Sequence, residues 1–164
     1  MIYQDYIMRM IEQLVRVLAK ILFNKEMGNY RRAFDEVDSA LKEFTGLDYN
    51  FITGLSDKDI IALLKIYEDN EITGAKCLVT GKLFKEAADL KAAENTNLDI
   101  SSDYQKALSL YLEGILNNKN SIELFSAFFK DIEEILERIK DDEISPDIKL
   151  KLIKFYELTG KAFI

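Results

Sequence analysis

The sequence has no histidine and only one cysteine, Cys77, among its 164 residues. Histidine is the side chain that most often carries proton relays near neutral pH and binds zinc, so its absence removes much of that chemistry. A single thiol cannot form an intrachain disulfide, which is consistent with a reducing compartment. Cys77 has apolar neighbours and is expected to be a buried structural thiol. We therefore expect no catalytic residue, no metal site and no cofactor.

Helix-breaking residues are also scarce. Proline occurs once and glycine seven times, whereas the two together average about 12% of a protein. Apolar residues recur with the period of a helix, and no segment alternates as a strand does. These patterns predict one all-α domain, residues 1–164, with about seven helices in antiparallel hairpins. The expected helices span 2–26, 29–45, 57–69, 72–95, 103–117, 121–140 and 146–160.

Capping residues support several of these boundaries. Gly28 and Gly46 follow the first two expected helices, where a left-handed C-cap favours glycine. Ser145 precedes Pro146, which is the usual order of residues at a helix start. The other predicted N-caps are Ser56, Ser102 and Asn120.

Acidic residues outnumber basic ones: the chain has 22 Lys and Arg and 29 Asp and Glu, which gives a net charge of -7. Binding to a phosphate backbone needs clustered basic residues, so we expect no nucleic-acid partner. The apolar N-terminal segment contains too many charges for a signal peptide or a membrane span, so we expect a cytoplasmic protein without membrane insertion. The interrupting residues are Asp5, Arg9, Glu12, Arg16 and Lys20.

An acidic run lies towards the end of the expected helix 121–140 and just beyond it. Basic residues are interspersed in it, and it lacks the glycine turn of a calcium loop. We therefore expect a solvated face rather than a cation site. The run consists of Asp131, Glu133, Glu134, Glu137, Asp141, Asp142 and Glu143.

An internal repeat links the second and fifth expected helices. The aromatic and small residues Tyr30, Ala33 and Ala40 recur 74 positions later as Tyr104, Ala107 and Gly114. This offset is close to two helix-turn-helix repeats of about 34 residues with a small insertion. Small residues seven positions apart allow a neighbouring helix to approach closely, so the repeat is a packing pattern.

The segment Gly28-Asn29-Tyr30, followed by Ala33, Val37 and Ala40, resembles the turn and second helix of a tetratricopeptide repeat. The preceding helix departs from that family, because Val17, Lys20 and Ile21 stand near the positions of its aromatic residue and Leu-Gly pair. The resemblance implies a right-handed array of stacked hairpins with a groove for a peptide or a helix. The whole chain is also similar to short, uncharacterised helical proteins of Gram-positive bacteria, a likeness that implies no activity.

Two segments are candidate interaction sites. Residues 47–55 are more apolar than an ordinary surface loop, so they either cover the core or expose an anchor for a partner, with Tyr49, Phe51 and Ile52 as the candidate contacts. The first helix has apolar residues on more than one side. Its seam either packs internally or mediates self-association. The candidate self-association residues are Ile7, Ile11, Leu14 and Leu18, and the flanking apolar positions are Met8, Met10, Val15, Val17 and Leu22.

These observations favour a protein-interaction or adaptor module that binds a protein or peptide and is not an enzyme. Two alternatives remain open. One is a structural homodimer formed through the N-terminal helix. The other is an enzyme or small-ligand binder built on carboxylate, tyrosine and lysine side chains, which a deep pocket with convergent polar groups would favour.

Overall fold

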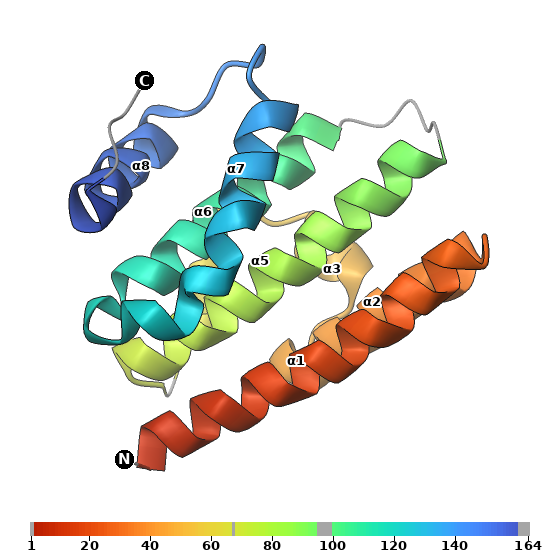
Figure 1. Cartoon of the computed structure of the whole chain (residues 1–164), viewed down its shortest axis with the longest axis horizontal. Helices are drawn as coiled ribbons and strands as arrows, with labels where there is room; N and C mark the ends of the chain where they lie inside the picture. Colours follow the sequence, from red (N-terminus) through yellow and green to blue (C-terminus); the bar gives the residue numbers. More distant parts are fainter. Residues whose placement is uncertain (1, 67, 95–99, 161–164) are drawn as a thin grey trace.

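The computed structural model describes residues 2–66, 68–94 and 100–160, and this part of the chain is all-α, as predicted (Figure 1). Every predicted helical region contains helix, although several boundaries differ. The elements are α1 (Ile2–Glu26), α2 (Tyr30–Thr45), α3 (Tyr49–Thr53), α4 (Asp57–Lys65), α5 (Asn70–Ala93), α6 (Ile100–Leu116), the 3₁₀ helix η1 (Lys119–Phe128), α7 (Phe129–Arg138) and α8 (Pro146–Thr159).

The antiparallel helices α5 and α6 form the centre of the fold (Figure 1). Glycines allow their backbones to meet. A Cβ atom at Gly114 would lie 2.6 Å from the carbonyl oxygen of Gly74, and one at Gly81 would lie 3.1 Å from that of Ala107. The glycines in α5, which weaken an isolated helix, are therefore required by the close packing of α6.

The hairpin of α1 and α2 packs against α5, whereas α7 and α8 pack against α6. The turn between α1 and α2 contains Gly28, and α2 ends at Gly46. Both glycines have left-handed backbone angles, with φ of +76° and +78°, as the sequence predicted. On the other side of the fold, α8 begins at the predicted N-cap Ser145, whose hydroxyl accepts the N–H of Ile148. The side chains that α8 buries are Ile148, Leu152 and Phe155.

The predicted helix 121–140 is wrong in its first half, because residues 119–128 form the 3₁₀ helix η1 and α7 begins only at Phe129. In a 3₁₀ helix, side chains three positions apart lie on the same face. Phe125 and Phe128 have this spacing and are both buried, and the Phe128 ring lies 6.0 Å from that of Tyr111. The predicted N-cap Asn120 falls inside η1, and its side chain is outside the described set.

Other boundaries also differ from the prediction. Helix α4 ends at Lys65, four residues early, and α5 starts at Asn70, because the carboxylate of Asp69 accepts the N–H of Ile72 and caps the helix. Helix α6 starts at Ile100, so Ser102 lies in its first turn and is not the N-cap. The predicted N-cap of α4 is confirmed, since the Ser56 hydroxyl accepts the N–H of Asp59.

The two copies of the repeat lie on corresponding helices. One copy is on α2 and the other is on α6, each of which is the second helix of a hairpin. The small residues Ala33, Ala40, Ala107 and Gly114 are buried in both copies. The small residues of the repeat therefore mark positions that both helices bury, and on α6 the backbone of α5 approaches closely at Ala107 and Gly114.

Candidate interaction surface

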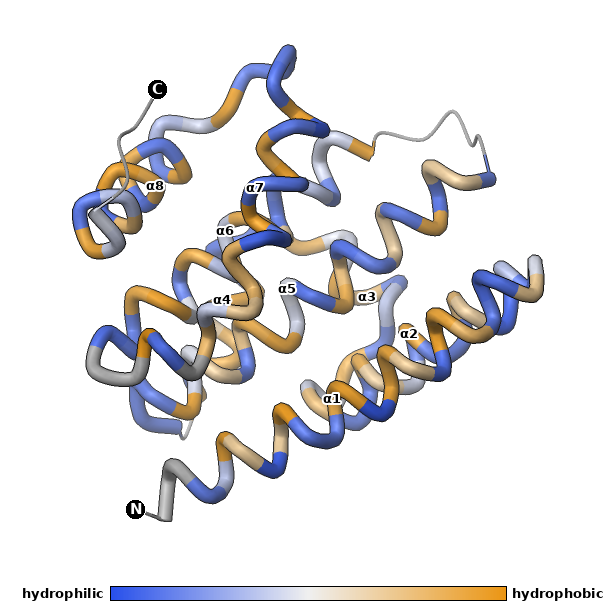
Figure 2. Tube along the Cα trace, in the orientation of Figure 1, coloured by the Kyte–Doolittle hydropathy of each residue, from blue (hydrophilic) through white to orange (hydrophobic). Residues whose placement is uncertain are grey.

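Helix α1 contacts α2 and α5 through one face and leaves much of its apolar surface exposed. The inward face buries Ile7, Met10, Leu14 and Ile21. Beside it runs a second apolar row, which consists of Met8, Ile11, Val15, Leu18 and Leu22 and is called the α1 row below. Met8, Val15 and Leu22 are 39%, 58% and 55% exposed, while Ile11 and Leu18 are half-buried at its inner edge. Figure 2 shows hydrophobic residues recurring along α1 between hydrophilic ones.

The α1 row lies on the side of the helix that turns towards α5. Lys25 is three residues after Leu22 and seven after Leu18, so the three side chains share one side of the helix. The ammonium group of Lys25 lies 3.7 Å from a carboxylate oxygen of Glu86 on α5. Two further apolar side chains near the end of α1, Phe23 and Met27, are also exposed.

The predicted self-association residues divide between two environments. Ile7 and Leu14 are buried in the protein's own core and are unavailable to a second copy of the folded chain. Ile11 and Leu18 remain partly accessible as members of the α1 row. The sequence of α1 contains two apolar seams, the predicted self-association seam and the α1 row, and Ile11 and Leu18 belong to both. The sequence does not show which of the two seams faces inwards. Met8, Val15 and Leu22 were visible as flanking positions and were not chosen as a site.

Residues 49–53 of the predicted irregular segment form the short helix α3. The carboxylate of Asp48 caps it by accepting the N–H of Phe51 at 2.8 Å, and Asp38 of α2 accepts the N–H of Tyr49 at 2.9 Å. Tyr49 and Ile52 are buried, and the Tyr49 ring packs edge-on against Phe34. Phe51 is the one of the three candidate contacts that is exposed, at 55%.

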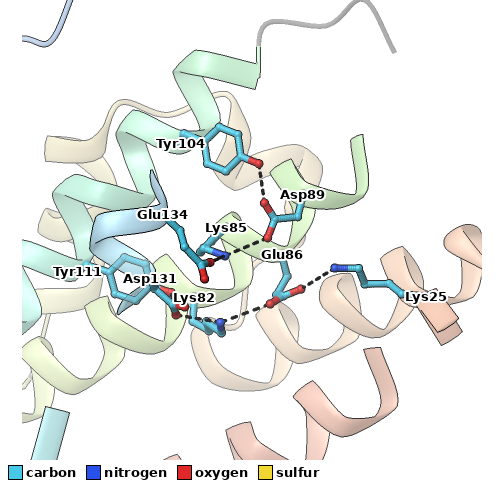
Figure 3. Close-up of polar contacts among 9 residues, drawn as sticks. All are labelled: Lys25, Lys82, Lys85, Glu86, Asp89, Tyr104, Tyr111, Asp131 and Glu134. Carbon is cyan, nitrogen blue, oxygen red and sulfur yellow. Dashed lines mark hydrogen bonds and ion pairs between the residues drawn. The ribbon is translucent and has the colours of Figure 1, made fainter. Parts of the chain in front are cut away.

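A chain of charged side chains connects α1, α5 and α7 (Figure 3). The ammonium of Lys82 lies 3.4 Å from a carboxylate oxygen of Glu86 and 2.8 Å from one of Asp131. Because Glu86 also pairs with Lys25, the three helices are joined through α5. The hydroxyl of the buried Tyr111 donates to Asp131 at 2.9 Å.

A second part of the network surrounds Lys85 on α5. Its ammonium lies 3.0 Å from carboxylate oxygens of both Asp89 and Glu134, and the hydroxyl of Tyr104 donates to Asp89 (Figure 3). These groups border a hollow of about 230 Å³. Polar groups thus converge here, as expected for a site built on carboxylate, tyrosine and lysine side chains. However, each of these four side chains is bonded to another member of the network.

The pKa shifts of these groups oppose acid/base chemistry near neutral pH. Burial lowers the pKa of Lys85, but the neighbouring Asp89 and Glu134 more than offset this effect, so the pKa is raised overall. Burial and the hydrogen bond to Asp89 raise the pKa of Tyr104, and burial followed by the Asp131 charge raises that of Tyr111. The lysine therefore stays charged and both phenols stay protonated. The arrangement is suited to holding helices together.

Sequence reasoning missed this network. The expected solvated face is only partly solvated, because Asp131 and Glu134 reach the α5 lysines. Its other members are exposed. The available signal was the presence of Lys82 and Lys85 in a helix whose apolar residues occur on nearly every side. Cys77 is buried, and burial raises the pKa of its thiol to about 12, so it is not a reactive nucleophile.

Most of this structure lies within a known protein family. The model described as "Family of unknown function (DUF6483)" matches residues 1–145. The chain belongs to this family. The DUF6483 match extends from α1 through α7 and stops at the N-cap of α8. It supports the similarity to uncharacterised proteins, and no curated protein and no solved structure matches the chain.

Two further features of this DUF6483 protein concern cations and membranes. Over residues 2–66, 68–94 and 100–160, no group of three or more acidic, cysteine or histidine side chains is placed to hold a metal ion. In the same ranges, no helix combines the length and apolar character needed to cross a bilayer.

Proposed function

We propose that this protein is a non-catalytic protein-interaction module of the cytoplasm, and that its binding surface is the α1 row. The observation that carries the proposal is the exposure of Met8, Val15 and Leu22 on a helix whose adjacent inward face is already packed. Contiguous exposed apolar surface on a folded protein typically marks a site of association. A partner helix that covered the row would remove these side chains from water.

The polar network supports an interaction module more than an enzyme. Lys85 and its neighbours bond to one another, and the raised pKa values of Lys85 and Tyr104 keep that ammonium and that phenol protonated at neutral pH. The resemblance of α2 and α6 to the second helix of a tetratricopeptide repeat agrees with the proposal, because stacked helical hairpins commonly present a surface to a peptide or helix.

A capture experiment tests this function. The tagged chain is recovered at near-endogenous level from its native cells, together with the variants Val15→Glu and Leu150→Glu, and bound proteins are identified by mass spectrometry. Leu150 on α8 is 53% exposed and serves as a matched control. We expect a stoichiometric partner, another protein or a second copy, to be lost with Val15→Glu and kept with Leu150→Glu. Failure to recover any partner, or equal recovery with both variants, would refute the proposal.

A cavity between α2 and α5 supports a second candidate function, small-ligand binding. Its volume of about 370 Å³ lies at the lower end of the range of ligand sites. Tyr30, Phe34 and Leu90 form an apolar wall, and the charged groups of Arg31 and Glu94 lie at its border. A metabolite screen by thermal shift tests this candidate. A genuine ligand should stabilise the wild type but not a folded Phe34→Ala variant.

A further inference from the structure

The two most exposed large apolar side chains of the described structure lie together at the end of the α1–α2 hairpin. Phe23 is 61% exposed and Met27 is 63% exposed, and neither belongs to the α1 row. The N–H of Met27 donates to the carbonyl of Phe23, so the two side chains lie on the same side of the helix. Figure 1 places this end of the hairpin at one end of the long axis of the molecule, where a flat surface can reach it.

Basic side chains surround this apolar pair, although the chain as a whole is acidic. Residues 16–32 contain five basic residues and one acidic residue, Glu26, which gives a net charge of +4. The rest of the chain has 17 basic and 28 acidic residues, a net charge of -11. Counting Asp35 and Glu36, in the next turn of α2, still leaves +2 at this end. Four of the basic side chains are exposed and form no ion pair within the described residues, namely Arg16, Lys20, Arg31 and Arg32.

The basic and apolar side chains share one surface. Arg16 and Lys20 precede Phe23 by seven and three residues, so they lie along the same side of α1. The left-handed Gly28 reverses the chain, and the first turn of α2 with its two arginines therefore lies at the same end of the hairpin. Stable attachment to a bilayer surface generally takes two signals, such as apolar insertion and a basic cluster. This end of the hairpin provides both.

We propose that the end of the α1–α2 hairpin docks onto the surface of an anionic lipid bilayer, with Phe23 and Met27 inserted at the level of the headgroups. The headgroup region accommodates side chains that project from a convex end, whereas a folded protein would need a hollow shaped to both of them. The contact is peripheral. This inference goes beyond the proposed function, because it uses side chains outside the α1 row and a different class of partner.

The acidic remainder of the chain does not prevent this contact. Salt screens exposed charges that are more than about 8 Å apart at physiological ionic strength. A bilayer that touches the end of the hairpin therefore interacts mainly with the positive charge of residues 16–32. The negative charge of the rest of the chain instead favours an orientation in which this end approaches the bilayer first.

Co-sedimentation of the purified full-length chain with vesicles tests the proposal. The probes are vesicles of phosphatidylcholine alone and vesicles of phosphatidylcholine and phosphatidylserine in equal parts, each at low salt and at about 0.15 M salt. We expect the chain to bind the vesicles that contain phosphatidylserine and not the others, and to bind less as the salt concentration rises. No binding to the anionic vesicles at low salt, or equal binding to both kinds of vesicle, would overturn the inference.

Matched variants show whether this end of the hairpin makes the contact. Phe23→Ser should weaken binding to the anionic vesicles by on the order of tenfold, because it removes an inserted ring. Arg32→Gln should weaken it by about fivefold, because it removes one charge near the surface. The controls Phe51→Ser on α3 and Lys149→Gln on α8 should bind like the wild type. All four positions are exposed, so each variant should keep the circular dichroism and melting temperature of the folded chain. Vesicle binding that Phe23→Ser leaves unchanged would overturn the inference.

An acidic protein is the competing partner for this surface. If the chain does not bind the anionic vesicles, and cellular capture yields an acidic protein that Phe23→Ser releases, the lipid inference is wrong. The proposed function is tested separately, because it depends on capture with Val15→Glu and not on vesicle binding.

Discussion

Replacing Lys85 by methionine tests whether the charged network that joins α7 to α5 stabilises the fold. Methionine keeps much of the apolar stem of lysine and removes the ammonium. The variant therefore leaves the core filled while Asp89 and Glu134 lose their shared partner.

The expected loss of stability lies between those of buried and exposed ion pairs. Removing one partner of a fully buried pair costs about 3–5 kcal/mol, whereas an exposed pair contributes about 0–1 kcal/mol. Asp89 keeps its hydrogen bond from Tyr104, and the side chain of Glu134 is 47% exposed and can be rehydrated. We therefore expect the free energy of unfolding to fall by about 2 kcal/mol and the melting temperature by about 4–8 °C.

The pH dependence gives an independent readout for Lys85. Its pKa is raised in the folded protein, so its contribution to stability is fully present below the unfolded-state pKa of about 10.4 and is lost as pH rises through the folded-state pKa. The stability difference between the wild type and Lys85→Met should be constant near neutrality and shrink above about pH 10.

Urea denaturation followed by far-ultraviolet circular dichroism measures both effects. Lys140→Met is the matched control, because Lys140 pairs with Glu137 on the exposed surface, and we expect no measurable change there. If Lys85→Met unfolds at the same urea concentration as the control variant, the reasoning about the network is wrong.

Three further outcomes can be measured on the purified chain. Gly114→Ala should lower the free energy of unfolding by about 1–3 kcal/mol by overpacking, whereas Gly54→Ala, with its nearest contact at 3.5 Å, should have little effect; equal urea midpoints would contradict the close helix packing. Ile52→Ala should destabilise the fold by about 2–5 kcal/mol and Phe51→Ser by much less, and the reverse order would contradict the orientation of α3. Cys77 should react with a thiol reagent only on unfolding, so fast labelling of the native protein would show that it is accessible.

The helices that carry strong periodicity and caps were predictable from the sequence. Gly46, Ser56 and Ser145 mark ends of helices as expected, because capping depends on a few neighbouring residues. The 3₁₀ helix η1 was not predictable in this way. It follows from the burial of Phe125 and Phe128 near Tyr111 on α6, which is a contact between elements.

The candidate surface was predictable only in part. The sequence shows that α1 has more apolar residues than one seam can hold, but the choice of inward seam depends on how α2 and α5 approach the helix. Ile7 and Leu14 consequently changed from candidate contacts to core residues. The ion pairs that Lys82 and Lys85 form with α7 depend on where α7 lies. The spacing of residues along α5 does not specify that position.

The glycine-mediated crossing of α5 and α6 has a mechanical consequence. Two helices usually slide past each other by letting the side chains between them change rotamer, which is the basis of shear motion. At Gly74 and Gly114 backbone meets backbone, so this adjustable layer is missing. We therefore expect α5 and α6 to keep their positions relative to each other. Any conformational change on binding should be a rotation of the α1–α2 hairpin relative to this central pair.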